Sequence, residues 1–250
     1  SPRREMPRAL WALDYLALAY RNREKGACHY RPGFLPNILK MGDFQPPETD
    51  IITLSRHVLN EGFKMANQKQ VTGEFTLLLN SLQTTCKVIE NLVRKARLNN
   101  MTGVAGAQNV QGEDQKKLDV ISNEVMVNAL VASGQSAVLV SEEEEEAIIV
   151  SDRRSAETGK YCLVFDPLDG SSNIDAGVNV GTIFGIYQVQ PGSTGSVKDV
   201  LRPGREMVAA GYCMYGSSAN IVLSTGTGVD GFTLDNSIGE FILTHPKIQI

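Results

Sequence analysis

The sequence predicts a layered, mixed α/β fold in which helices come first along the chain and strands come later. Apolar residues recur at helical spacing in three stretches between residues 51 and 130. From residue 137 onward they gather in short runs bounded by turn residues, which is typical of buried strands. Because the two kinds of segment do not alternate, we expect packed layers and not repeated βαβ units.

Three helices are expected, each with one apolar face. Thr49 and Asp50 form a capping pair for the first of them. A glycine-rich connector over residues 103–112 precedes the third. The helices are predicted over residues 49–59, from Thr72 or Thr76 to about Arg97, and over residues 118–130.

Eight strands are expected in the second half of the chain. Their apolar runs are short enough for strands and are separated by Gly, Ser, Asp and Pro residues. The runs lie at residues 137–140, 147–150, 161–165, 182–189, 207–214, 220–223, 231–234 and 240–244.

Composition excludes several classes of protein. A chain of 250 residues, 42% hydrophobic and with a net charge of −4, has neither the basic excess of a nucleic-acid-binding protein nor an apolar run that approaches the ~20 residues of a membrane span. The four cysteines form no Cys-x-x-Cys pair, and three of them lie in apolar stretches. We therefore expect buried free thiols in a reducing compartment.

The first 45 residues differ from the rest and are expected to be a basic, irregular extension. Residues 1–40 hold eight Lys or Arg residues against three acids, and they include four prolines. Two interpretations are open: an Arg-rich organelle-targeting segment, or upstream translated sequence without a folded role, which we favour. A short amphipathic helix over residues 9–20 is compatible with either. Residues 46–250 form the predicted folded domain.

The segment from Asp166 to Asn173 carries the clearest chemical signal. Asp166 and Asp169 follow the apolar run 161–165, and a Gly-Ser-Ser turn comes directly after them. Carboxylates at a strand end suit hard cations, and such a turn offers backbone N–H groups to an anion. The segment therefore predicts a site for a metal and a phosphate.

Two further acidic clusters accompany it, at residues 113–119 and 142–146. Two cations close together need several shared carboxylates, and Glu142, Asp166 and Asp169 are the minimal set that we select. Glu113 and Asp114 have an alternative role as partners of a helix N-terminus. The run from Glu144 to Glu146 is expected to be a solvated turn.

Several motifs together resemble the fructose-1,6-bisphosphatase family. They are Val-Ser-Glu-Glu at 140–143, Phe-Asp-Pro-Leu-Asp-Gly-Ser-Ser-Asn-Ile-Asp at 165–175, Gly-Thr-Ile-Phe-Gly-Ile-Tyr at 181–187, Lys-Lys-Leu-Asp at 116–119 and the segment 72–82. The resemblance covers residues 50–250, and it is strongest to the fungal-type enzymes. It implies a sugar phosphatase fold with αβαβα layers, of which this chain is the N-terminal part.

The resemblance also implies the roles of the site residues. The implied metal ligands are Glu113, Glu142, Glu143, Asp166, Asp169 and the carbonyl of Leu168. Asp119 and Glu143 are implied as the catalytic pair that orients and deprotonates the attacking water. The substrate phosphate is expected at Asp169, Gly170, Ser171 and Ser172.

An inhibitory AMP site is implied as well, between the first two helices. Its residues correspond to Thr72, Gly73, Glu74, Phe75, Thr76, Lys160 and Tyr161. Gln188 stands where an arginine usually contacts AMP, so this chain lacks one positive charge of that site.

By resemblance, the expected activity is Mg²⁺-dependent hydrolysis of the 1-phosphate of fructose 1,6-bisphosphate, with Mn²⁺ or Zn²⁺ as possible substitutes. The family implies a cytoplasmic homotetramer of gluconeogenesis, with no nucleic-acid or membrane partner. It continues beyond position 250 with the sugar contacts, so we expect a truncated product with little or no activity. The alternatives are a related enzyme acting on sedoheptulose 1,7-bisphosphate and a non-catalytic remnant that binds a nucleotide or a partner.

Overall fold

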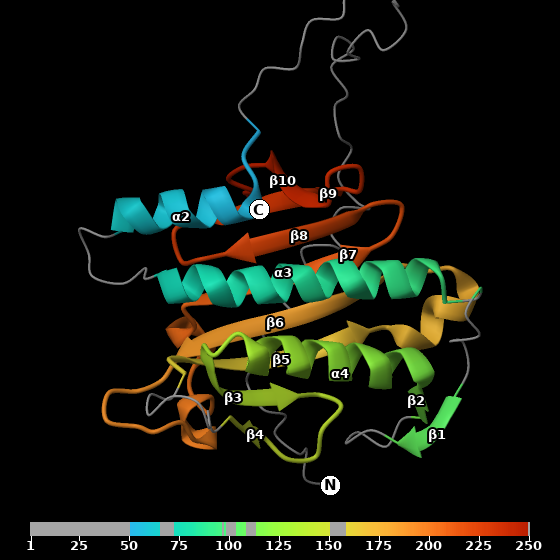
Figure 1. Ribbon diagram of the computed structural model, residues 1–250, viewed down its shortest axis with the longest axis horizontal. Coiled ribbons are helices and arrows are strands. Elements are labelled where there is room, and N and C mark those ends of the chain that lie inside the picture. Colours follow the sequence, from blue (N-terminus) through green and yellow to red (C-terminus); the bar gives the residue numbers. More distant parts are fainter. Residues whose placement is uncertain are drawn as a thin grey trace, which may run out of the picture. The chain divides into compact units, whose positions relative to one another are not determined.

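The computed structural model describes residues 51–65, 73–96, 98, 104–108, 114–150 and 159–249. The predicted N-terminal extension, Cys28, Thr49, Asp50, Thr72 and Glu113 lie outside these ranges. Figure 1 shows the helices and strands of the described part.

An eight-stranded sheet forms the centre, in the order β10-β9-β8-β7-β6-β5-β3-β4. β3 and β5 run parallel, and the other neighbouring pairs are antiparallel. The strands are β3 (Ser136–Ser141), β4 (Ile148–Ile149), β5 (Tyr161–Asp169), β6 (Val180–Gln188), β7 (Ala209–Tyr215), β8 (Ala219–Ser224), β9 (Val229–Asp235) and β10 (Glu240–His245). All eight predicted strands are confirmed, but β5 continues past Phe165 through both aspartates.

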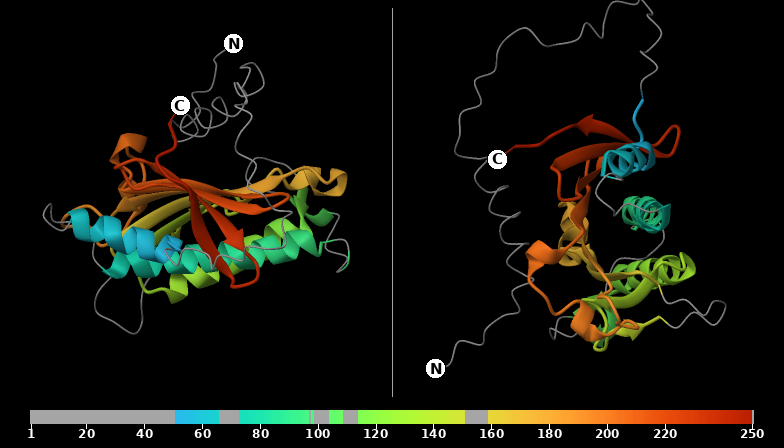
Figure 2. Two further views of the ribbon diagram at one scale, coloured as in Figure 1. Left: turned by 90° about the horizontal axis from the view of Figure 1, so that it is seen from above. Right: turned by 90° about the vertical axis from the view of Figure 1, so that its left-hand side faces the viewer.

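Three helices cover one face of this sheet, as Figure 2 shows. They are α2 (Leu54–Met65), α3 (Gly73–Arg94) and α4 (Lys117–Ala132). Leu78, Leu82 and Cys86 recur every fourth residue along α3 and are buried in the main core between helices and sheet. The layered arrangement predicted from the order of helices and strands is confirmed for this part of the chain.

The predicted start of the first helix is wrong. The helix begins at Leu54, because the preceding residues join the edge of the sheet. The carbonyl of Ile52 accepts a hydrogen bond from the N–H of Leu243 at 2.9 Å, and Thr53 bridges to Ile242. The Thr53 hydroxyl then accepts the N–H of Arg56 at 3.2 Å and so takes the capping role that was predicted for Thr49 and Asp50.

Two other boundaries differ from the predictions. The second helix ends at Arg94 and not at Arg97, and Thr76 lies inside it, so Thr76 is not its cap. The glycine-rich connector contains β1 (Val104–Gln108), which pairs with β2 (Asp114–Lys116) in a separate two-stranded sheet. Alanine and glycine dominate β1, so it lacks the apolar alternation by which strands are recognised.

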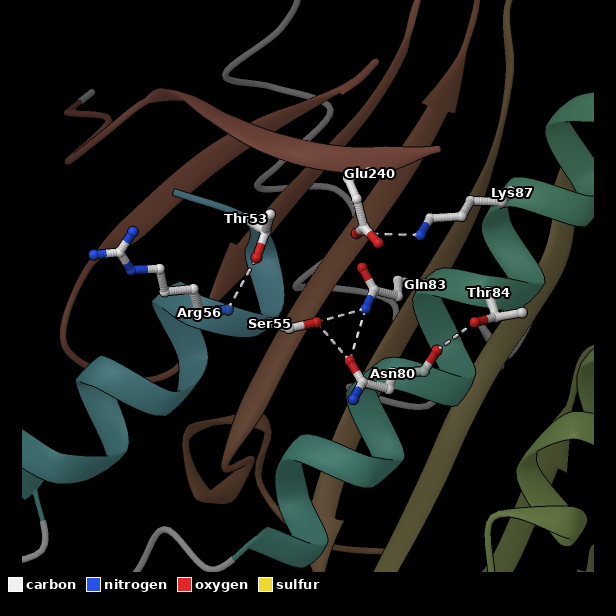
Figure 3. A network of polar contacts seen from close by, with 8 residues as sticks. All are labelled: Thr53, Ser55, Arg56, Asn80, Gln83, Thr84, Lys87 and Glu240. Atoms are coloured by element: carbon white, nitrogen blue, oxygen red, sulfur yellow. Dashed lines mark hydrogen bonds and ion pairs between the residues drawn. The ribbon is translucent and has the colours of Figure 1, made fainter. Parts of the chain in front are cut away.

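Polar side chains fasten α2, α3 and β10 to one another (Figure 3). Gln83 donates through Nε2 to the Ser55 hydroxyl at 2.8 Å and to Asn80 Oδ1 at 2.7 Å. Lys87 forms an ion pair with Glu240 of β10 at 3.4 Å. These contacts hold α2 and α3 together and join α3 to β10, the strand at one edge of the sheet.

The other face of the sheet is covered in part by the segment 190–208, which follows β6. A small second core lies there, formed by Ala137, Val138, Cys162, Tyr187 and Val200. Cys86, Cys162 and Cys213 are buried free thiols, as predicted. Among the helices of the described residues, none has both the length and the apolar character of a membrane span.

Candidate metal and phosphate site

A β-bulge brings the two aspartates of β5 to one face of the sheet. Asp166 pairs with Ile183 of β6 and Asp169 pairs with Gly181, so two residues of β5 stand opposite the single residue Thr182. In a regular strand, residues three apart point to opposite faces. Here their partners are two apart, and directly paired residues share a face, so both carboxylates lie on the same side.

A tight turn follows the bulge and starts a short 3₁₀ helix, η3 (Ser171–Ala176). Gly170 has a φ of 79°, a left-handed conformation that favours glycine, and its carbonyl accepts the N–H of Asn173 at 2.9 Å. Ser171 and Ser172 occupy the first turn of η3, whose N–H groups have no partner within such a turn and suit an anion.

Helix α4 contributes Asp119 in its first turn. This carboxylate is buried, and its Oδ2 accepts a hydrogen bond from the Ser171 hydroxyl at 3.0 Å. A residue of the predicted catalytic pair therefore touches the predicted phosphate turn.

The acidic turn after β3 is tied to the same helix through Asn123, one turn after Asp119. The Ser141 hydroxyl donates to Asn123 Oδ1 at 2.8 Å, and Asn123 Nδ2 donates to Glu144 Oε1 at 2.7 Å. The N–H of Glu142 bonds to the carbonyl of Phe165 at 3.0 Å. Glu144 is exposed, as predicted, but it is also an anchor of the turn.

The contacts of Asn123 and Ser141 with the acidic turn were not predicted from the sequence. The spacing of Asp119 and Asn123, four residues apart on one helix, is the signal that places both on one face. Thr182, opposite the bulge, was also missed, because a threonine within an apolar strand is ordinary.

The carboxylates of β5 and of the acidic turn repel one another. Burial raises the pKa of Asp166 from 3.8 to about 8, with further increases from Asp169, Glu142 and Glu143, and only the N–H of Leu168, at 3.0 Å, opposes the change. Asp166, Asp169, Glu142 and Glu143 thus lie close enough for their charges to interact, whereas Glu113 lies outside the described residues. Leu168 itself is buried in the main core.

These donors suit a divalent cation in kind. Carboxylate oxygens are the preferred ligands of hard cations, and a bound cation would offset the repulsion between Asp166 and the neighbouring carboxylates. Among the residues that the structure describes, no three His, Cys, Asp or Glu side chains stand in a metal-holding arrangement. The chemistry of the donor set, rather than a closed coordination shell, is what fits the ion.

Four of the predicted nucleotide residues meet at the opposite end of β5. Lys160 forms an ion pair with Glu74 at 2.6 Å, and the rings of Phe75 and Tyr161 lie 5.6 Å apart. Gln188 is the direct β6 partner of Tyr161. The N-terminus of α3 and the start of β5 are thus joined, and AMP binding there stays a prediction.

Comparisons with known proteins give a consistent result. The family described as "Fructose-1-6-bisphosphatase, N-terminal domain" matches residues 52–246. Cytosolic fructose-1,6-bisphosphatase of Brassica napus is 60% identical over 201 residues, 80% of this chain and 58% of the relative. The Arabidopsis thaliana protein of the same name is 59% identical over 202 residues, 81% of this chain and 58% of the relative.

A solved structure also matches. The holo form of Leishmania major fructose-1,6-bisphosphatase superimposes with a TM-score of 0.71 at 47% identity, covering 79% of this chain and 59% of that one. The chain thus spans less than two thirds of the length of these relatives. The fungal subclass suggested by the sequence stays a prediction.

Proposed function

The chain belongs to the fructose-1,6-bisphosphatase family, and from that premise we propose that it acts in the hydrolysis of the 1-phosphate of fructose 1,6-bisphosphate. The observation that carries this proposal is the bulge of β5, which sets Asp166 and Asp169 on one face beside the turn at Gly170. Acidic oxygens next to the N–H groups of a turn suit a cation-assisted reaction on a phosphate ester.

In the proposed mechanism, Glu142, Glu143, Asp166, Asp169 and the carbonyl of Leu168 would hold divalent cations such as Mg²⁺, joined by Glu113. When bound, these ions would lower the pKa of water and offset the charge of the phosphate. The N–H groups of Gly170 and Ser171 orient the phosphate for in-line attack. Asp119 and Glu143 position the attacking water and take up its proton.

The partners and the location of this protein are further proposals, and they rest on its family membership. The plant relatives are named as cytosolic, which supports a cytoplasmic location for this chain. A homotetramer and a role in gluconeogenesis are proposed on family membership.

Replacing Asp169 tests the proposed activity. We expect Asp169→Asn to lower cation-dependent phosphate release from fructose 1,6-bisphosphate by roughly 100-fold or more, because it removes one charged oxygen of the cation site. The matched control is Glu145→Gln, an exposed acid two residues from Glu143, which should keep the wild-type rate. Equal rates for Asp169→Asn and wild type would contradict the proposal, and a wild-type chain without Mg²⁺-dependent release would favour the alternative of a non-catalytic remnant.

AMP binding is a second proposed property, supported by the joining of α3 to the start of β5. The side chains involved are Glu74, Phe75, Lys160 and Tyr161. We expect Lys160→Ala to weaken AMP binding at least tenfold in calorimetry, since it removes the cation of the pair, whereas Lys198→Ala, in the segment over the other face of the sheet, should leave it unchanged. AMP binding that is equally strong in Lys160→Ala would refute this assignment.

A further inference from the structure

A hydroxyl pair lies in the core directly beneath the bulge of β5. The Thr182 side chain is fully buried, and its Oγ1 donates to the carbonyl of Pro167 at 2.8 Å. The hydroxyl of Tyr215, from β7, lies 2.7 Å from the same Oγ1. Because a threonine hydroxyl has a single proton, the Tyr215 hydroxyl must donate to Thr182, which in turn donates to Pro167.

The bulge needs such a partner for a physical reason. Two residues, Pro167 and Leu168, face one residue of β6, so the regular hydrogen-bond ladder is interrupted there. Proline also has no N–H to contribute to a ladder. A hydroxyl from the opposing strand gives the Pro167 carbonyl a bond inside an apolar core, where a polar group without a bond is costly.

We propose that Thr182 is a positioning residue, which with the Tyr215 hydroxyl holds the bulge in the form that keeps Asp166 and Asp169 on one face. The part of this proposal that concerns cation binding rests on the proposed function. The part that concerns the bulge itself stands on the contacts of Thr182 alone.

The chemistry of Tyr215 supports a permanent role as donor. Burial raises the pKa of its hydroxyl well above the ordinary value, and the neighbouring Cys86 and Cys213 raise it further. The phenol therefore keeps its proton at every pH at which the protein works, and the direction of the chain of bonds does not change.

The test compares valine and serine at position 182. Thr182→Val keeps the shape of the side chain and removes both bonds, whereas Thr182→Ser keeps the hydroxyl. The matched control is Thr85→Val on α3, a threonine that is also buried and whose hydroxyl donates to the Ser81 carbonyl of its own helix at 3.0 Å. Tyr215→Phe removes the upstream donor and serves as a second variant if Thr182→Val does not fold.

Two readouts are measured on the full chain. The first is the affinity for Mn²⁺ by calorimetry, which we expect to fall roughly 10- to 100-fold in Thr182→Val and to recover in Thr182→Ser. The second, without metal, is hydrogen exchange of the Leu168 amide, which donates to the Asp166 carboxylate within the bulge. We expect exchange to quicken at least tenfold in Thr182→Val and to stay as in wild type in Thr85→Val.

The outcomes separate the two proposals. Wild-type protein that binds no Mn²⁺ would refute the proposed function, while the exchange of the Leu168 amide still decides the role of Thr182. Unchanged exchange in both Thr182→Val and Tyr215→Phe would overturn the positioning role. An equal loss of Mn²⁺ affinity in Thr182→Val and Thr85→Val would overturn it as well, because the effect would then be one of stability alone.

Discussion

A single carboxylate organises the segment that covers the second face of the sheet. Asp199 is buried and accepts hydrogen bonds from the N–H of Gln190 at 2.8 Å, the hydroxyl of Ser193 at 2.6 Å, and both the N–H and the hydroxyl of Ser196 at 2.9 and 3.2 Å. Burial acts to raise its pKa, but these bonds outweigh burial and hold the pKa below its ordinary value. The hydrogen bonds of the segment therefore stabilise the charged form of Asp199.

We expect Asp199→Ala to lower the free energy of unfolding by about 2 kcal/mol, because four donor groups lose a charged acceptor. Urea denaturation at pH 7 measures it. Asp235→Ala is a suitable control, since Asp235 binds Ser237 in the same way but in an exposed turn, and it should change little. A loss no larger than that of the control would show that the segment does not depend on this carboxylate.

At the scale of residues, the acids of the site were predictable and their supports were not. Asp166, Asp169 and Glu142 stand out because carboxylates at strand ends suit hard cations. Thr182 and Tyr215 carry no such signal, and Asn123 is marked only by its spacing from Asp119. Their roles depend on bonds to residues 15 to 33 positions away, which a pattern along the chain does not contain.

At the scale of elements, the strands were predictable because buried residues alternate with less buried ones along several of them. β7 and β8 alternate between buried and half-buried residues, and this period of two is visible in the sequence. The bulge of β5 breaks that period at Pro167, where a turn was the obvious prediction for Asp-Pro and Asp-Gly. The strand instead extends to Asp169, because pairing with β6 resumes at Gly181.

The start of α2 is a second place where the pattern along the chain does not determine the structure. Ile51 and Ile52 continue the helical apolar pattern, but the Ile52 carbonyl is taken by Leu243, almost two hundred residues later in the chain. The local spacing of apolar residues favours a helix, but a hydrogen bond to a residue distant in sequence places Ile52 at the edge of the sheet.

At the scale of the whole folded unit, β5 joins the two proposed sites. Lys160 and Tyr161 lie at its start, and Asp166 and Asp169 lie at its end. Nine residues of strand separate the ends by roughly 26 Å at about 3.3 Å per residue. One strand, held between β3 and β6 inside the sheet, thus connects the proposed nucleotide site to the proposed cation site.

The repulsion among the acids also governs how stability depends on pH. The pKa of Asp166 is about 8 in the folded protein and 3.8 when unperturbed, so between these values the folded state keeps a proton that the unfolded state has lost. The free energy of unfolding therefore falls as pH rises through this window, by at most about 1.4 kcal/mol per pH unit from this group. Above about pH 8 the carboxyl group has lost its proton in both states, and the stabilising contribution of Asp166 is fully lost.

We therefore expect the melting temperature, measured in the presence of a chelator, to be lower at pH 8 than at pH 5.5. Asp166→Asn should flatten this dependence, because the amide has no charge to bury, whereas Glu145→Gln should preserve it. Excess Mg²⁺ should raise the melting temperature more at pH 8, where the carboxylates are charged and able to bind it. A melting temperature that stays level or rises from pH 5.5 to 8 in the wild-type protein with chelator would show that the acids do not repel one another as their arrangement requires.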